Sequence, residues 1–132
     1  MGLGTVSPKV TLSAIGQIAI PVKDLDRATA FYRDALGLSF LFSAPPGLSF
    51  FDAGGVRLML SRPEGVEAAG SSVLYFKVGD IRAAHEELKS RQVRFTDEPH
   101  IIAEMDTYHL WMAFFKDSED NMLAIMSEAP RT

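Results

Sequence analysis

The apolar and polar positions near the start of the chain predict a strand followed at once by a helix. Residues 15–22 are rich in β-branched and apolar side chains, which is typical of a strand, and Pro21 favours an edge strand or a strand end. Apolar residues then recur at the spacing of an amphipathic helix over residues 25–36. We expect the carboxylate of Asp24 to cap this helix and Gly37 to end it in a left-handed conformation.

Three short strands and a linker follow the helix. The strands are expected at residues 38–42, 48–52 and 56–61, because turn-forming Pro and Gly residues separate these apolar runs. A polar segment with further Pro and Gly residues, 63–71, is expected to be a linker. The predicted order up to this point is strand, helix, strand, strand, strand.

The same order begins again after the linker. The second set of elements is expected to be a strand at 72–78, a helix after Asp80, strands at 93–95, 108–115 and 122–126, a loop at 98–106 and a turn at 117–121. The two sets match at a constant spacing, with Val22, Asp24, Leu25 and Ala28 corresponding to Val78, Asp80, Ile81 and Ala84. This repeat predicts two βαβββ modules, while two unrelated strand–helix units remain the alternative.

The repeat divides the chain into four parts. Residues 1–13 have no clear period and are expected to form a flexible arm. Residues 14–62 form the first predicted module, residues 63–71 the linker, and residues 72–128 the second module, all within one domain.

The composition narrows the classes of function. Of the 132 residues, 47% are hydrophobic, which is enough for a folded core, and the net charge of −4 comes from interspersed charges. That balance argues against a nucleic-acid partner, which needs a clustered basic face. The chain has no cysteine, no apolar run long enough to span a membrane and no secretory signal at its start. We therefore expect a cytoplasmic protein with neither disulfides nor thiolate metal sites.

Two motifs resemble those of a known superfamily. Residues 22–38 resemble its strand end, its Asp-x-x-x-Ala and Phe-Tyr helix and its Leu-Gly-Leu stop. Residues 115–121 resemble its Phe-x-Asp-Pro-Asp-Gly-Asn turn, with Ser118 and Asp120 in place of the usual proline and glycine. Through these motifs, residues 14–128 resemble the vicinal-oxygen-chelate superfamily, which includes glyoxalase I, extradiol dioxygenases and the bleomycin and fosfomycin resistance proteins.

The resemblance implies an α+β fold with a central cleft. In this superfamily the two modules form curled mixed sheets, each an open half-barrel, with the helices outside. Strand side chains alternate between the helix side and the cleft. Members commonly pair their half-barrels within or between chains, so we expect a homodimer.

In glyoxalase-like members, four cleft positions hold a divalent metal ion. The resemblance places Gln17, Met59, Val73 and Ala124 at these positions. Only Gln17 offers an oxygen, Met59 offers a soft thioether, and the other two side chains carry no donor. We therefore expect no metal ion and no other cofactor at these positions.

The cleft is instead expected to bind a small molecule among aromatic, methionine and polar side chains. The predicted ligand-binding residues are Gln17, Phe40, Phe42, Arg57, Met59, Tyr75, Lys77, His100, His109, Trp111, Ala124 and Met126. Arg57 and Lys77 would hold an anionic head group, or alternatively face water at the rim. Trp111 is alternatively part of the core or of a dimer interface, because both faces of residues 108–115 are apolar.

The histidines and carboxylates offer alternatives to a metal-free binding cleft, namely a metal site at another place or a general base. His85 lies among charged residues of the predicted second helix, and we expect it to be exposed to solvent. A relocated metal site is conceivable from His100, His109 and Glu104, although their spacing is not that of a known metal motif. One of the carboxylates of the predicted loop is a candidate general base, namely Glu98, Glu104 or Asp106.

These observations leave three hypotheses for the function. The first is a glyoxalase/bleomycin-resistance-like protein that binds a small apolar or aromatic molecule in a metal-free cleft. The alternative is a metal-dependent lyase, isomerase or dioxygenase of the same superfamily, with a divalent metal relocated to His100 and His109. The third is a subunit whose barrel is filled by its own side chains and which only binds other proteins.

Overall fold

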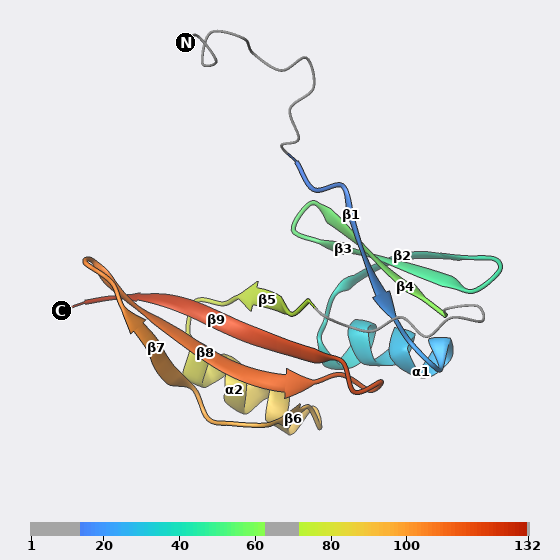
Figure 1. Ribbon diagram of the computed structural model, residues 1–132. Coiled ribbons are helices and arrows are strands. Elements are labelled where there is room, and N and C mark those ends of the chain that lie inside the picture. The colour runs from blue at the N-terminus through green and yellow to red at the C-terminus, as the bar shows by residue number, and fades with distance from the viewer. Residues whose placement is uncertain (1–13, 63–71, 132) are drawn as a thin grey trace, which may run out of the picture.

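The computed structural model describes residues 14–62 and 72–131, and it consists of two β-sheets that each carry a helix on one face (Figure 1). The predicted α+β fold is confirmed. The predicted arm, 1–13, and linker, 63–71, lie outside the described residues. Among the helices of the described segments, none has the length and apolar character needed to cross a bilayer.

The first module follows the predicted order. Its elements are β1 (Gln17–Pro21), α1 (Leu25–Ala30), a π-helical turn η2 (Phe31–Ala35), β2 (Ser39–Ala44), β3 (Leu48–Ala53) and β4 (Val56–Ser61). The sheet has the order β1-β4-β3-β2, with β1 parallel to β4, so Pro21 lies on an edge strand as predicted. The predicted helix is therefore present, with its second half widened into the π-helical turn. Gly37, at a φ of 77°, follows it as expected.

The second module contains one strand that the sequence did not predict. Its elements are β5 (Leu74–Lys77), α2 (Ile81–Ser90), β6 (Arg94–Phe95), β7 (His100–Glu104), β8 (Tyr108–Lys116) and β9 (Met122–Pro130). The strand order is β5-β9-β8-β6, and β7 also pairs with β8. The predicted loop at 98–106 is thus wrong for residues 100–104: the local pattern there does not alternate, and antiparallel pairing with β8 makes this segment a strand.

The two modules begin their helices in the same way. Asp24 and Asp80 precede their helices with nearly equal backbone angles, φ −120° and ψ 104° against φ −118° and ψ 104°. Each carboxylate accepts a hydrogen bond from the amide three residues later, at 3.0 Å from Arg27 and 3.1 Å from Ala83. Both predicted N-caps are therefore confirmed.

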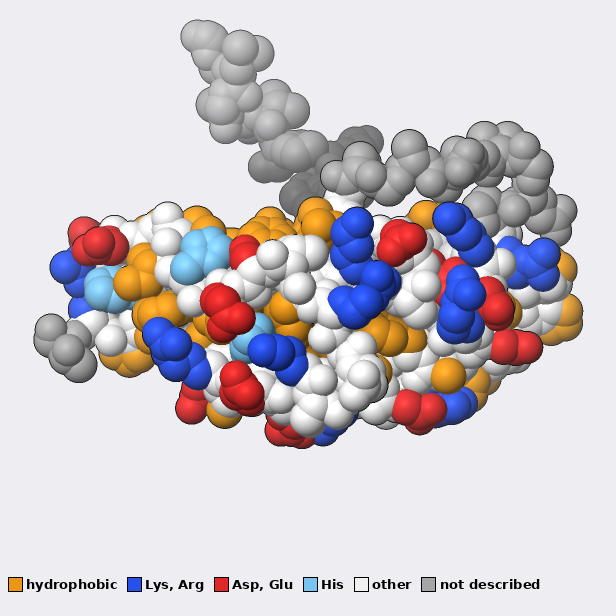
Figure 2. All heavy atoms as spheres, turned by 90° about the horizontal axis from the view of Figure 1, so that it is seen from below, with side chains coloured by type: hydrophobic (Ala, Val, Ile, Leu, Met, Phe, Trp, Pro, Cys, Tyr) orange, Lys and Arg blue, Asp and Glu red, His pale blue; other side chains and the backbone are white. Residues whose placement is uncertain are grey.

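Each sheet has one face covered by its helix and one face without a helix. In the first module, Ile20, Phe51 and Leu58 are buried against Ala28 and Tyr32. In the second module, the buried residues on the face covered by α2 include Phe115, Leu123 and Ile125. We call the opposite surface of each sheet its helix-free face. Over the surface seen from below, Lys, Arg, Asp and Glu side chains are interspersed (Figure 2).

The turn between β8 and β9 joins the two modules through buried polar contacts. The Tyr32 hydroxyl donates to Asp117 Oδ2 at 2.7 Å, and the Asn121 amide donates to the Pro21 carbonyl oxygen at 2.9 Å. Glu119 Oε1 accepts from the backbone amides of Lys23 and Asp24, at 2.8 and 2.9 Å. We call this set of contacts the module joint.

Ionisation in the module joint is strongly biased by its surroundings. Burial opposes the charge of Glu119, but hydrogen bonds from Arg27, Asp24, Ser118 and Lys23 outweigh it and lower the pKa of Glu119 to about 2. Burial, together with the charge and the hydrogen bond of Asp117, raises the pKa of Tyr32 well above its ordinary value. Glu119 is therefore charged and Tyr32 neutral at physiological pH.

His85 is buried rather than exposed, so the prediction for it is wrong. Only 2% of the residue is accessible, and its ring packs edge-on against Phe95 with centroids 4.4 Å apart. It lies one helical turn after Ile81, on the face of α2 that packs on the sheet. Within the described residues its Nε2 atom has no hydrogen-bond partner.

Replacing His85 with leucine is expected to leave the free energy of unfolding unchanged or to raise it by about 1 kcal/mol, because the change removes a buried unpaired polar atom. Urea denaturation at pH 7 measures this. Lys89→Ala on the exposed side of the same helix is the control. A loss above about 1 kcal/mol in the leucine variant would mean that the imidazole has a partner that these contacts omit.

Candidate functional site

The helix-free face of the first sheet carries four of the predicted ligand residues: Gln17, Phe42, Arg57 and Met59. The Gln17 amide donates to the Met59 sulfur at 3.6 Å. Phe42 stacks on Phe50 with ring centroids 4.6 Å apart, and the Arg57 guanidinium lies 5.5 Å from the Phe50 ring centre. Phe42 is 46% exposed, so this aromatic surface is open in the single chain.

Phe40 does not share this face, contrary to the prediction. A bulge between Phe40 and Phe42 shifts the register of β2 against β3, so that Phe40 pairs with Phe51 and Phe42 pairs with Phe50. Phe40 therefore contacts the helix-side residue Phe51, with centroids 5.4 Å apart. One inserted residue turns the side chains beyond it to the other face of a sheet, which the alternation in the sequence does not reveal.

The helix-free face of the second sheet carries most of the remaining candidates. They are Tyr75, Lys77, His100, Ala124 and Met126, placed there by the pairing of Tyr75 with Ala124, Lys77 with Met126 and His100 with Met112. Tyr75 is 45% exposed and packs edge-on against Phe114 at 5.9 Å. The Lys77 ammonium lies 3.1 Å from the Glu128 carboxylate, so its charge is already paired.

Trp111 and His109 lie on the other face of this sheet. Trp111 packs against the core on the helix side, where the Arg82 guanidinium lies 5.0 Å from its ring centre. The pairing of His109 with Glu104 and of Trp111 with Ile101 places both residues opposite His100 and Met112. Of the alternatives for Trp111, packing against the core is therefore the one observed, and Trp111 and His109 do not share the helix-free face with the other candidates.

The donor sets do not fit a divalent metal. His100 and His109 project from opposite faces of the sheet, so a single ion cannot be held by both within one chain. No group of three or more His, Cys, Asp and Glu side chains within residues 14–62 and 72–131 is arranged to hold an ion. Met59 and Ala124, two of the superfamily's metal positions, occupy corresponding places in the two modules. Met59 pairs with Ala19 of β1, and Ala124 pairs with Tyr75 of β5 in the same way. Neither offers a hard ligand.

Apart from Phe40, His109 and Trp111, the predicted ligand residues thus lie on two separate surfaces, the helix-free faces of the two sheets. Within the described segments, no hydrogen bond or ion pair joins the helix-free face of one sheet to that of the other. The carboxylates considered as a general base are all exposed, and Glu104 lies on strand β7 with 65% of its side chain accessible.

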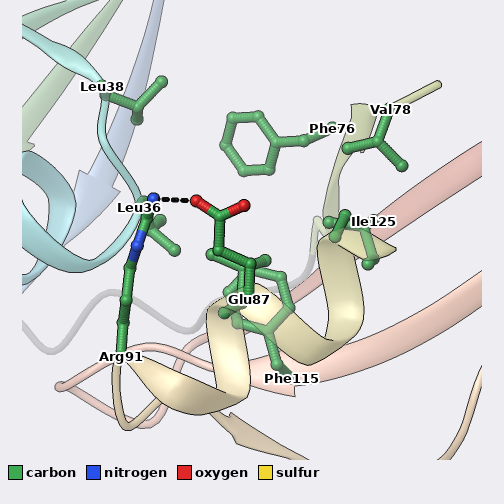
Figure 3. Close-up of a pocket in the computed structure, with 10 residues that line it drawn as sticks. Leu36, Leu38, Phe76, Val78, Glu87, Arg91, Phe115 and Ile125 are labelled. Atoms are coloured by element: carbon green, nitrogen blue, oxygen red, sulfur yellow. Dashed lines mark hydrogen bonds and ion pairs between the residues drawn. The ribbon is translucent and has the colours of Figure 1, made fainter. Parts of the chain in front are cut away.

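Sequence reasoning missed an apolar pocket between the modules. Its volume is about 240 Å³, and none of the predicted ligand residues lines it (Figure 3). It is lined by Leu36, Leu38, Phe76, Val78, Ala84, Glu87, Leu88, Arg91, Phe115 and Ile125. The sequence did not predict this pocket because its walls come from both modules, and local sequence patterns do not determine how the two modules are placed relative to each other.

Comparisons with known proteins place the chain in a family. Residues 14–125 match the model of the Glyoxalase/Bleomycin resistance protein/Dioxygenase superfamily. Mitochondrial methylmalonyl-CoA epimerase of Mus musculus is 30% identical over 112 residues, which cover 72% of this chain and 63% of that protein.

Two solved structures illustrate the shared fold. The crystal structure of lactoylglutathione lyase from Agrobacterium tumefaciens has a TM-score of 0.68 and 26% identity, covering 88% of this chain and 94% of that one. TnmS3, an antibiotic binding protein from Streptomyces sp. CB03234, has a TM-score of 0.73 and 21% identity, covering 91% of this chain and 99% of that one. With its two modules, its motifs and the family model in agreement, the chain belongs to the Glyoxalase/Bleomycin resistance protein/Dioxygenase superfamily.

Proposed function

We propose that this protein binds a small apolar or aromatic molecule between the helix-free faces of its sheets, without a divalent metal at the superfamily's metal positions. The observation that carries the proposal is the chemistry of those faces. Phe42 and Tyr75 are exposed, and each packs on a further aromatic ring. Exposed aromatic and methionine side chains suit a hydrophobic ligand that few polar groups hold in place.

Arg57 is the group proposed to select among such ligands. No ion pair engages it within residues 14–62 and 72–131, whereas Lys77 is paired with Glu128. Arg57 lies beside the stacked rings of Phe42 and Phe50. A planar aromatic molecule with a carboxylate or phenolate would place its ring on these side chains and its anion on the guanidinium.

A homodimer is part of the proposal, because one chain leaves both faces open. The first module of one copy would face the second module of its partner and enclose the ligand. This arrangement would also cover exposed apolar side chains such as Leu41 on β2 and Ile102 on β7, which are 46% and 47% exposed. The similarity in fold to TnmS3, described as an antibiotic binding protein, supports a binding role of this kind.

Calorimetric titration with a panel of neutral and anionic aromatic compounds tests the function. We expect at least one anionic member to bind with a dissociation constant below about 1 mM, and Arg57→Gln to weaken it about tenfold. Arg33→Gln is the matched control, because Arg33 is paired with Asp34 in the helical layer and should leave the affinity unchanged.

Elemental analysis and sedimentation of the same sample complete the test. The proposal expects no stoichiometric divalent metal after dialysis and a mass twice that of the chain. A tightly retained metal ion, or a panel in which nothing binds below about 1 mM, would contradict it.

A further inference from the structure

We propose a second ligand site in the pocket between the modules, which would take an uncharged aromatic molecule of one or two rings. The pocket opens where the end of η2 and the start of β2 meet α2 and β5. In Figure 3, Leu36 and Leu38 of the first module lie across from Phe76 of β5 and from Val78, which follows that strand. Ala84 and Leu88 of α2 add a further apolar wall.

The walls are apolar side chains that are not fully covered. Leu36, Leu38, Phe76 and Val78 pack against the core cluster but remain only partly buried. The pocket is open to solvent, so a ligand that covers these apolar side chains removes their surface from water and stabilises the complex. Since both modules contribute walls, such a ligand would also strengthen their association.

The apolar walls and the paired charges at the rim disfavour an ionic ligand. Glu87 and Arg91 form an ion pair one helical turn apart, and the Arg91 guanidinium also donates to the Ala35 carbonyl oxygen at 3.2 Å. Both side chains are partly exposed and already paired, so an anion or a cation would lose hydration against the apolar walls and would find no free opposite charge. A neutral molecule avoids both penalties.

The volume sets the size of the ligand. The pocket measures about 240 Å³. It exceeds the cavity of about 150 Å³ that holds benzene in an engineered protein core, and it is below the lower bound of about 300 Å³ for drug-sized sites. One or two aromatic rings fit between these limits.

This site is independent of the proposed function. Successive residues of β5 point to opposite sides of the sheet, so Phe76 lines the pocket while Tyr75 and Lys77 face the helix-free side. Val78, directly after β5, also lines the pocket. A molecule in the pocket therefore contacts none of the residues proposed to hold the first ligand.

Methyl chemical-shift mapping of the full chain with indole tests the proposal. We expect saturable shifts at Leu36, Leu38, Val78, Leu88 and Ile125 with a dissociation constant of about 1 mM or tighter. Indole-3-carboxylate, which adds a negative charge to the same rings, is expected to bind there at least about tenfold more weakly. The methyl groups of Met59 and Met126 report separately on the helix-free faces.

Two substitutions on α2 provide the matched comparison. Ala84→Phe fills the pocket and should weaken the indole response at least about tenfold. Ala83→Phe places the same ring on the exposed side of the helix and should leave it unchanged. The second site is refuted if the pocket methyl groups of the unaltered protein do not shift, or if shifts occur only at Met59 and Met126. This outcome does not depend on whether the proposed function is correct.

Discussion

Replacing Asp117 with alanine is expected to lower the free energy of unfolding by about 3 kcal/mol or more, because it leaves several buried donors without an acceptor. Asp117 is fully buried and accepts the Tyr32 hydroxyl at 2.7 Å. It also accepts the backbone amides of Glu119 and Asn121 at 2.7 and 2.8 Å. These bonds shape the β8–β9 turn and attach it to the first module, so their loss affects both modules.

Urea denaturation at pH 7 measures this effect. Asp120→Asn is the matched control, because Asp120 lies in the same turn with 65% of its side chain exposed; we expect a change below about 0.5 kcal/mol. A loss of less than about 1 kcal/mol in the alanine variant would show that the Asp117 contacts do not hold the modules together.

Replacing Glu119 with glutamine is expected to remove a large part of the acid sensitivity of the protein. The pKa of Glu119 is lowered from an ordinary value of 4.5 to about 2, so the folded state binds its proton less readily than the unfolded state. The charged carboxylate then contributes stability that is complete above pH 4.5 and is lost as the pH falls towards 2. The difference corresponds to about 3 kcal/mol, of which about 2 kcal/mol disappears between pH 5 and pH 3.

Urea denaturation at several values between pH 7 and pH 3 tests this prediction. The gap in stability between the natural protein and Glu119→Gln should narrow by about 2 kcal/mol as the pH falls from 5 to 3. The exposed residue Glu98 supplies the control, because Glu98→Gln should give a curve parallel to that of the natural protein. A gap that stays constant with pH would refute the role of the Glu119 charge.

The module joint explains why the two largest effects come from one short turn. Only 1% of the Glu119 side chain is accessible, and it holds Arg27 at 2.7 Å together with the amides that precede α1. A carboxylate at this place also complements the positive end of the helix. Loss of the joint is therefore expected to separate the modules rather than to unfold one helix locally.

The sequence by itself determined the features that depend on near neighbours. The caps at Asp24 and Asp80 bond to amides three residues away, and Gly37 adopts its left-handed conformation within one turn of the helix. Alternation along β1 and β4 correctly placed Gln17, Arg57 and Met59 on one face. The repeat of these local signals predicted the order of elements in the two modules, and the resemblance of residues 22–38 and 115–121 to known motifs indicated the superfamily.

Only the tertiary structure decided the features that depend on register and on packing between distant segments. Pairing with β8 made a strand of His100–Glu104, and it set His100 and His109 on opposite faces. A bulge turned Phe40 away from Phe42, and docking of α2 buried His85. The pocket and the module joint bring together residues far apart in the chain. Their partners are chosen by long-range contacts, which the order of side chains along a single strand or helix does not encode.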